Sequence, residues 1–479
     1  MTWPAVVAWA LIFIGLMWRS PLFLFYLFFA LGPFGTLNML GAEGGFNLLP
    51  QSACGVFLVA KSLLARGQLA RAIALAIDPK ALGLLFAFTL YSLFTAYMMP
   101  RLFYHMTEVI ELSLSTAHWP VPLEPTTQNL TQSIYLTLSF SIVLIFALGC
   151  RQTSFKFHCL NGVLVTGIFL VLTGLVDLVL SAAGLSDLLQ PFRSASYALL
   201  TEDAVLGSKR VVGLMPEASG FAPPCVTTAA LLTFLRPCYE NPWWRNLFVP
   251  LVIAGLVAMA VLSTSSTGYA GLAIFAITFG VNWLRRSMNP LAPHRQGLNA
   301  EAAGAAFGAC ALFAIITLSP HALDYAYDMV DAILFKKSES DSYIERHYWT
   351  TTAINAFIAT NGLGVGLGSA RTSSWFAAVL SNTGIIGAAL LGVFFLRLYI
   401  LPCRSQDPAI REFVTALKLG LIPWFFMAWG SWPSPDFGVS VASILGLITG
   451  QLASSIPSTI VTGIPLVHQI GARGRPWAT

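Results

Sequence analysis

The sequence predicts an all-α protein whose helices form a bundle that crosses a membrane many times. Of its 479 residues, 56% are hydrophobic and only 10% are charged, whereas a soluble domain carries about a quarter charged residues. Apolar stretches close to the roughly 20 residues that cross the hydrocarbon core recur along the whole chain. We therefore expect a single integral membrane domain that covers residues 1–479.

About thirteen apolar stretches qualify as membrane spans. We predict them at 3–18, 21–40, 47–64, 81–99, 132–150, 159–184, 221–235, 247–264, 268–284, 301–318, 376–400, 414–430 and 437–455. Lys and Arg accumulate in cytoplasmic loops, so their distribution orients the chain. With the N-terminus outside and the C-terminus inside, eight of the 26 lysines and arginines fall on the outer side, namely Arg101, Arg193, Lys209, Arg210, Lys336, Lys337, Arg346 and Arg371. The net charge of +5 then reflects ordinary anchoring and indicates no nucleic-acid partner.

This topology leaves three sizeable outer loops, at about 100–131, 185–220 and 319–375. The cytoplasmic loops are too short for a folded catalytic domain, so any chemistry is expected at the outer face or in a cavity between helices. The chain has no Walker motif and no glycine-rich dinucleotide fingerprint, and its seven cysteines never form a CxxC pair. The sequence therefore predicts neither a cofactor nor a metal centre.

The first outer loop contains His105, Glu108 and Glu111 at intervals of three. This spacing places the three side chains on one face of a helix. We expect an amphipathic outer helix with a solvated acidic side, and a metal site is the alternative.

The second outer loop predicts a surface helix plus linker over Asp187–Ser208, followed by Lys209 and Arg210. Glu217 then stands at the mouth of a span, between prolines and glycines that interrupt the helix. A carboxylate in that place is costly unless it is paired. Two hypotheses stay open: Glu217 pairs with Arg210 and pins the loop, or it contacts a ligand or acts as a base.

The third outer loop predicts a helix that places Tyr343, Arg346, His347 and Thr350 on one face and continues through Ala356. An arginine can bind a phosphate through two parallel hydrogen bonds. A histidine beside it can exchange a proton near neutral pH.

A glycine run follows, with Gly364, Gly366 and Gly368 before Arg371. Alternating glycines let the backbone approach a ligand, and successive free N–H groups can form an anion-binding nest. Tight helix packing is the alternative for the glycines alone. Together with Arg371 they favour a phosphate site, and the residues predicted to line it are Lys209, Tyr343, Gly366, Gly368, Ser373, Ser374 and Trp375.

The order of these motifs resembles the O-antigen ligase and Wzy-type polysaccharide polymerase superfamily of bacterial inner membranes. After Arg210 and the Glu-Ala-Ser element at 217–219 come the Ser-Thr-Ser-Ser-Thr-Gly run at 263–268, the Arg-x-x-Trp element at 346–349, the glycine run and the Asn-Thr-Gly-Ile-Ile-Gly element at 382–387. The resemblance covers roughly residues 205–400. The ligases and many of the polymerases have a His-Asn element shortly after the glycine run, where this chain has Ser-Ser-Trp at 373–375. The family's histidine therefore does not carry over.

The resemblance implies a GT-C-like membrane fold and a metal-independent, inverting glycosyl transfer at the periplasmic face of the inner membrane. It implies an undecaprenyl-diphosphate-linked glycan as donor and as acceptor, with Arg210, Arg346 and Arg371 holding the diphosphate. A polysaccharide chain-length regulator is expected as a partner, besides the lipid bilayer. The residues themselves offer Glu217 and His347 as catalytic bases on the outer side.

Three functions follow as hypotheses. The first is a polymerase that joins repeat units of an O-antigen, capsule or exopolysaccharide. The second is a ligase that transfers a finished glycan to lipid A core, and the missing His-Asn element disfavours it. The third is a transporter or flippase of lipid-linked sugars, which should show discontinuous helices or charges within its spans. Asp177 is nearly the only acidic residue inside a predicted span, which favours an enzyme.

Overall fold

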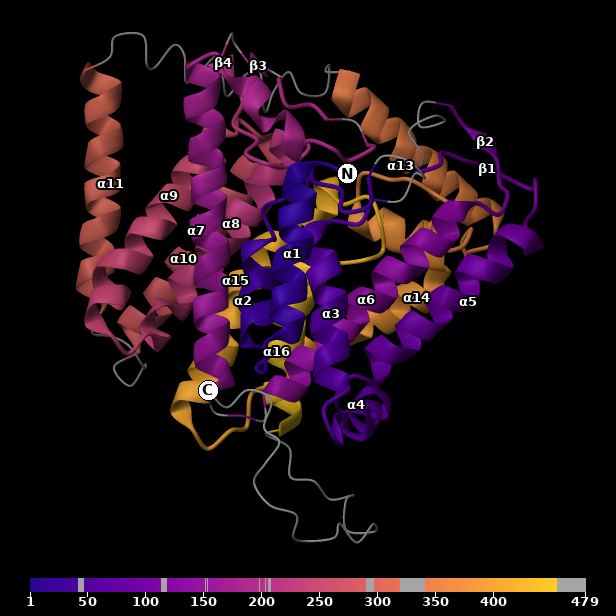
Figure 1. The fold of residues 1–479 in the computed structure, drawn as a ribbon, viewed down its shortest axis with the longest axis horizontal. Coiled ribbons are helices and arrows are strands. Elements are labelled where there is room, and N and C mark those ends of the chain that lie inside the picture. Colours follow the sequence, from indigo (N-terminus) through magenta and orange to yellow (C-terminus); the bar gives the residue numbers. More distant parts are fainter. Residues whose placement is uncertain are drawn as a thin grey trace, which may run out of the picture.

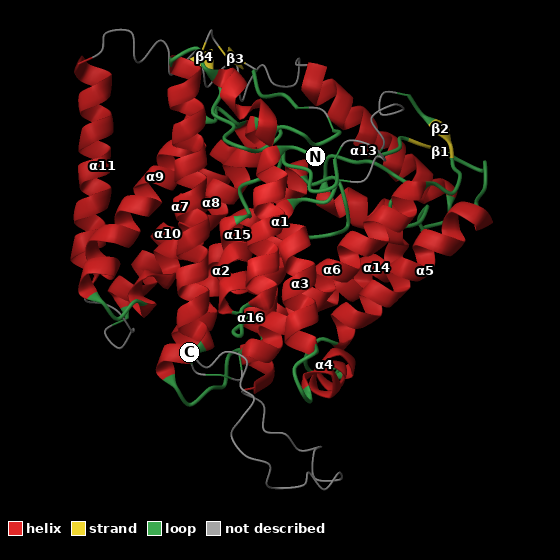
Figure 2. Ribbon diagram, in the orientation of Figure 1, coloured by secondary structure: helices red, strands yellow, loops and turns green. Residues whose placement is uncertain are grey.

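The computed structural model is a bundle of helices with four very short strands (Figures 1 and 2). It describes residues 1–41, 47–112, 119–150, 152, 154–197, 199–202, 204–205, 208–289, 297–318 and 341–454. The helices are α1 (Trp3–Met17), α2 (Leu22–Ala30), α3 (Pro50–Leu63), α4 (Gln68–Ile77), α5 (Gly83–Leu102), α6 (Thr127–Gly149), α7 (Phe155–Ala182), α8 (Ala218–Leu235), α9 (Val249–Leu262), α10 (Ser266–Met288), α11 (Leu298–Leu318), α13 (Asp341–Ala359), α14 (Trp375–Ile400), α15 (Pro408–Ser431) and α16 (Val439–Ser454). The strands are β1 (Glu108–Val109), β2 (Val121–Pro122), β3 (Ala204–Val205) and β4 (Ser208–Lys209).

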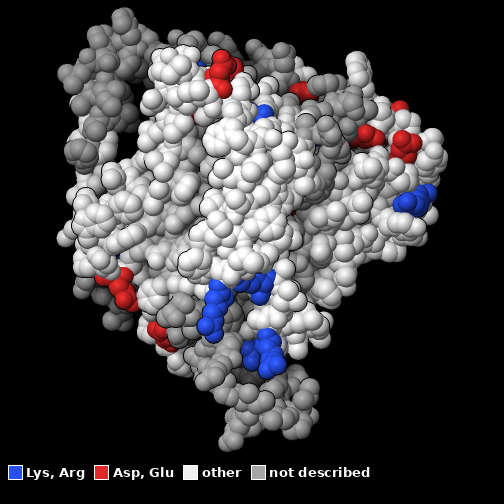
Figure 3. Space-filling view, viewed as in Figure 1, with Lys and Arg blue, Asp and Glu red and all other residues white. Residues whose placement is uncertain are grey.

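Among the described residues, eight helices are long and apolar enough to cross a membrane, namely α5, α6, α7, α8 with the 3₁₀ turn after it, α9 with the π turn before it, α10, α14 and α15. A ninth is added if the bent pair α3 and α4 counts as one span, and α1 and α16 are shorter apolar helices. Figure 3 shows a broad uncharged band across the middle of the molecule, with charged side chains above and below it. This is the pattern of an all-α membrane protein. The count of thirteen spans and the orientation remain predictions.

The predicted span at 21–40 is wrong in its second half. The helix α2 ends at Ala30, and the chain continues as turns through Gly32, Pro33 and Gly35. Proline lacks a backbone N–H, and glycine favours irregular backbone. The turn is instead held by Thr36, whose N–H and hydroxyl both donate to the carbonyl of Leu214 at 3.1 Å.

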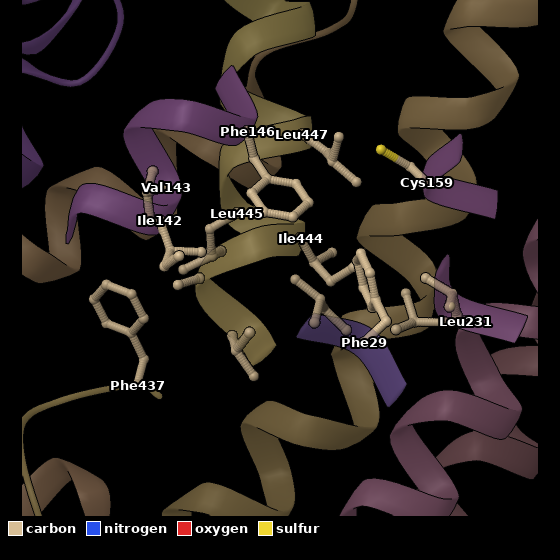
Figure 4. Packing of buried hydrophobic residues seen from close by; sticks show 14 of the residues in the cluster. Phe29, Ile142, Val143, Phe146, Cys159, Leu231, Phe437, Ile444, Leu445 and Leu447 are labelled. Atoms are coloured by element: carbon tan, nitrogen blue, oxygen red, sulfur yellow. The ribbon is translucent and has the colours of Figure 1, made fainter. Parts of the chain in front are cut away.

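The core of the bundle includes a very close contact between α6 and α16. Gly446 and Gly450 are four residues apart, so they lie on one face of α16. A Cβ on Gly446 would lie 2.4 Å from the carbonyl oxygen of Val143, and one on Gly450 would lie 2.6 Å from that of Ala147. Small residues at this spacing let membrane helices approach closely. Figure 4 shows the surrounding buried side chains, which include Phe146.

Two predicted outer helices are replaced by other structure. His105, with a φ of 56°, follows the end of α5, and Glu108 lies in β1, which pairs with β2. The predicted helix face at 105–111 is therefore wrong, because the chain turns and then becomes extended. Over 187–208 the structure has a 3₁₀ helix at Ser186–Phe192 and then β3, which pairs with β4. Pro191 and the irregular backbone after it explain why no α-helix continues there.

Candidate functional site

Two of the predicted site residues meet although 129 positions separate them in the sequence. Nη2 of Arg346, on α13, lies 3.4 Å from Oε1 of Glu217, directly before α8. The same Nη2 atom lies 3.4 Å from the hydroxyl of Ser219, which also donates to Glu217. Both ionic side chains are partly exposed, at 24% for Arg346 and 33% for Glu217. The pair is therefore accessible to solvent.

Glu217 owes its place to the way in which α8 begins. It is the N-cap residue, with extended backbone at φ −155° and ψ 166°, and its carbonyl accepts from the N–H groups of Gly220 and Phe221. Its carboxylate stands at the positive end of the helix, where a negative charge is stabilised. The same end of α8 would stabilise a phosphate.

A second helix N-terminus lies beside the first. A Cβ on Gly268, in the first turn of α10, would lie 2.6 Å from the Cβ of Ala222 on α8. Ser265 caps α10 by accepting from the N–H of Gly268 at 3.4 Å. The positive ends of α8 and α10 therefore lie beside each other.

Arg346 is positioned by a link between α13 and the segment before α14. The hydroxyl of Ser373 donates to the carbonyl of Arg346 at 3.0 Å and lies 3.1 Å from the hydroxyl of Thr350. The prediction of a helix through Ala356 is confirmed, since α13 covers Asp341–Ala359. In Figure 1, α13 lies across the upper end of the bundle. This placement directs Arg346 toward α8.

Arg371 is the second arginine near Glu217. Its guanidinium lies 3.8 Å from the centre of the Trp349 ring, in a cation–π contact. Burial lowers the pKa of Arg371, the carboxylates of Glu345 and Glu217 oppose this shift, and the charge of Arg346 adds to it. The guanidinium stays charged, because arginine is not deprotonated in proteins. The charge of Arg371 therefore interacts with those of Glu345, Glu217 and Arg346.

Arg210 occupies a different position. It donates from Nε to the carbonyl of Ser263 at 3.2 Å and from Nη2 to the carbonyl of Thr264 at 3.3 Å. Its guanidinium therefore holds the turn between α9 and α10 and neutralises the end of α9. The hypothesis that Arg210 pairs with Glu217 to pin the loop is not what the structure presents, because the partner of Glu217 is Arg346.

Lys209 belongs to an ionic cluster away from Arg346. Its Nζ lies 3.5 Å from Asp177 and 3.3 Å from Glu202. The role of Lys209 in lining the substrate stays a prediction. Glu202 also pairs with Arg193 at 3.2 Å. Its neighbour Asp203 lies outside the described residues, as do Lys336 and Lys337.

The glycine run does not offer a free anion-binding nest. Gly364 donates its N–H to Thr360, Gly366 donates to the carbonyl of Asn382, and Gly368 donates to the side chain of Asn382. Gly366 and Gly368 are buried, with φ of 99° and 88°. A Cβ at either position would lie 2.6 Å from a backbone carbonyl oxygen, of Thr95 and Gln128 respectively. The run serves close packing against α5, α6 and α14, so the predicted phosphate nest and lining role of these glycines are wrong.

The other predicted lining residues take mixed positions. Tyr343 is exposed, and its ring lies parallel to that of His347, with centroids 6.1 Å apart. Ser374 is the N-cap residue of α14, and its N–H donates to the hydroxyl of Thr372. Trp375 donates from its indole to the carbonyl of Pro435 at 3.2 Å and packs among aromatic residues of α14 and α15. Ser374 and Trp375 therefore support the start of α14, while Tyr343 and His347 face solvent.

Within the described residues, no group of three or more His, Cys, Asp or Glu side chains is arranged to hold a metal ion. His105 lies 3.9 Å from Glu124, and Glu108 is in β1. The metal alternative for the first outer loop loses its geometric basis, because that alternative required a single helix face.

Two residues of the site, Trp349 and Ser219, were not predicted as site residues from the sequence. The indole ring of Trp349 supports Arg371, and the nitrogen of that indole is buried without a hydrogen-bond partner. Ser219 bridges Glu217 and Arg346. The motifs that contain them were visible, but only the fold brings the partners together.

The described residues form a helical membrane protein in which Arg346, Glu217 and Ser219 meet at the start of α8. No protein-family model matches the chain, and no curated protein matches it.

Proposed function

We propose that this protein is a glycosyltransferase that polymerises undecaprenyl-diphosphate-linked oligosaccharide repeat units at the periplasmic face of the bacterial inner membrane. The observation that carries the proposal is the ion pair of Arg346 with Glu217 at the start of α8, with Arg371 on the ring of Trp349, about one turn along α13 from Arg346. Arginine is suited to phosphate recognition, and a carboxylate beside it supplies a base. The product is an O-antigen, capsule or exopolysaccharide chain.

The reaction requires one bond to form and one to break. A hydroxyl of the acceptor glycan attacks the anomeric carbon of the donor, the bond from that carbon to the diphosphate oxygen breaks, and the configuration inverts. The lipid diphosphate leaves with the bonding electron pair. Its growing negative charge is stabilised by Arg346, Arg371 and the positive end of α8. A diphosphate is already a good leaving group, so the arginines suffice without a metal ion.

Glu217 is the proposed base that takes the proton of the attacking hydroxyl. In the structure its carboxylate pairs with Arg346. A diphosphate that binds Arg346 competes for the guanidinium and frees the carboxylate for the acceptor. Donor binding would thus activate the base, and His347, which is exposed and beside the arginine, is the weaker candidate.

The partners of this reaction are a lipid-linked donor and a lipid-linked acceptor, both supplied from the bilayer. The proposal includes no cofactor. A chain-length regulator that binds the protein would explain how polymer length is set, and it follows from the family resemblance alone.

The lipid-linked intermediate that accumulates in a deletion strain tests the function. The proposal predicts a single repeat unit on undecaprenyl diphosphate, located in the outer leaflet. A full-length lipid-linked polymer would instead identify a ligase. A single unit confined to the inner leaflet would identify a flippase, and either result would overturn the polymerase.

A further inference from the structure

The segment 210–217, which connects β4 to α8, is fixed along its length by contacts that are not part of the charged site. The N–H of Val211 donates to the carbonyl of Leu262 at 3.3 Å, and the carbonyl of Pro216 accepts from Leu200 at 2.9 Å. Arg210 holds one end of the segment to the turn after α9, and Glu217 stands at the other end. The separation of these two residues therefore depends on the path between them.

Asp177 holds the middle of this path. Its Oδ2 atom accepts from the N–H groups of Val212 at 2.9 Å and Gly213 at 3.0 Å. Gly213 has a φ of 57°, and a Cβ there would lie 2.9 Å from the ring of Phe221 on α8. The chain therefore turns sharply at Gly213, and Asp177 fixes the two amides that form the turn.

The second oxygen of Asp177 lies in an ionic cluster. Oδ1 lies 3.5 Å from Nη2 of Arg193 and 3.5 Å from Nζ of Lys209. The side chains of Asp177 and Arg193 are each 2% exposed. The contacts of Oδ1 are ion pairs without a hydrogen bond, and displacing the buried carboxylate would leave these charges unpaired. The turn is thus held rigidly to α7.

We infer that Asp177 is a positioning residue for glycosyl transfer, which sets the place of Glu217 by fixing the turn at Val212 and Gly213. The inference rests on the proposed function. It separates two tasks within one reaction: Arg346 and Arg371 hold the donor, whereas Asp177 places the base without touching the donor. Misplacement of a catalytic group by about 1 Å can cost about 100-fold in rate.

The test compares Asp177→Asn with Glu202→Gln in the full-length protein. Asparagine has the shape of aspartate but lacks the charge that binds Arg193 and Lys209. Glu202 belongs to the same cluster, but its side chain is 62% exposed, so its loss should matter little. If Asp177→Asn lowers the amount of folded protein, the double variant Asp177→Asn with Lys209→Met is measured in place of the single variant. The double variant removes one negative and one positive charge together, so no charge of the pair is left without its partner.

Three quantities are measured for each variant: the affinity for a lipid-linked diphosphate donor, the turnover number, and the amide hydrogen exchange of Val212 and Gly213. We expect Asp177→Asn to lower turnover about 10- to 100-fold, with donor affinity unchanged and faster exchange at both amides. Glu202→Gln should match wild type in all three. Equal losses of affinity and turnover, or wild-type turnover in Asp177→Asn, would overturn the inference.

The exchange measurement also separates this inference from the proposed function. A wild-type protein that elongates no glycan would refute the function. The two amides would still report whether Asp177 fixes the turn, and wild-type exchange in Asp177→Asn would refute the positioning role by itself.

Discussion

Replacement of Arg346 should abolish activity while leaving the fold nearly intact. Its contacts to Glu217 and Ser219 are both 3.4 Å long, and the ion pair is partly exposed. A pair of this kind contributes about 1 kcal/mol or less to the free energy of unfolding. Arg346→Ala should therefore reach the membrane and melt close to the wild-type temperature.

The expected loss of activity is much larger. A guanidinium that binds a phosphate through two parallel hydrogen bonds gains about 1.5–3 kcal/mol from each. The loss of both costs about 3–6 kcal/mol, which corresponds to roughly a 10²- to 10⁴-fold lower kcat/KM. Arg346→Lys should recover little, because lysine keeps the charge but lacks the planar fork.

The assay measures elongation of lipid-linked repeat units by purified protein, together with thermal unfolding. Arg101→Ala is the matched control, because Arg101 is also predicted to lie on the outer side but donates to the carbonyl of Tyr97, at 2.6 Å, and stacks on the Tyr97 ring. We expect this control to elongate at the wild-type rate. Wild-type elongation by Arg346→Ala, or unfolding of that variant as the cause of its inactivity, would refute the reasoning.

Three further predictions follow from the site and the packing. Glu217→Gln should bind donor but form almost no polymer, whereas His347→Ala should keep measurable activity; a fully active Glu217→Gln would refute the role of Glu217 as base. Elongation should proceed equally in a chelator and in added magnesium or manganese, and activity that needs one divalent ion would contradict the arginine-based mechanism. Gly366→Ala should lower the free energy of unfolding by about 2–4 kcal/mol, because its φ is 99° and the new Cβ would lie 2.6 Å from the carbonyl oxygen of Thr95. Gly392→Ala, in α14 with no atom within 4 Å of the new Cβ, should stabilise the helix by about 0.5–1 kcal/mol, and equal effects of the two changes would contradict the packing argument.

The helical membrane architecture could be predicted because hydrophobicity acts over whole segments. Runs of apolar residues identify α5, α6, α7 and α14 with only small errors at their ends. The same averaging failed at 21–40, where apolar composition continues past Ala30 but the backbone does not stay helical. In the turn that follows, the N–H of Thr36 donates to the carbonyl of Leu214, which is far away in the sequence. Composition alone carries no information about such a partner.

The glycine run illustrates a different limit. Glycine permits positive φ whether the backbone approaches a ligand or another part of the protein. Gly364 and Gly368 take that conformation, but the acceptors of their N–H groups are Thr360 and Asn382. The spacing of the glycines indicated a close approach of the backbone, but it did not show that the other partner is the protein itself.

The charged residues divide in the same way. Arg346 and Glu217 were both singled out as site residues, but their pairing depends on α13 crossing the bundle next to the start of α8. Lys209 and Arg210 are adjacent in the sequence and were expected to act together. In the structure Lys209 binds Asp177, whereas Arg210 binds the end of α9. Adjacent side chains that point in different directions take different partners.

Elongation by the purified protein is the most direct test of the central claim. Wild-type protein in lipid bilayer discs is given undecaprenyl-diphosphate-linked repeat units, and the products are separated by length and assayed for released undecaprenyl diphosphate. We predict a ladder of lipid-linked oligomers, with one undecaprenyl diphosphate released for each bond formed, and neither product from Arg346→Ala or Glu217→Gln. An unelongated donor after incubation with folded wild-type protein, or equal ladders from wild type and both variants, would contradict the assignment of glycosyl transfer to this site.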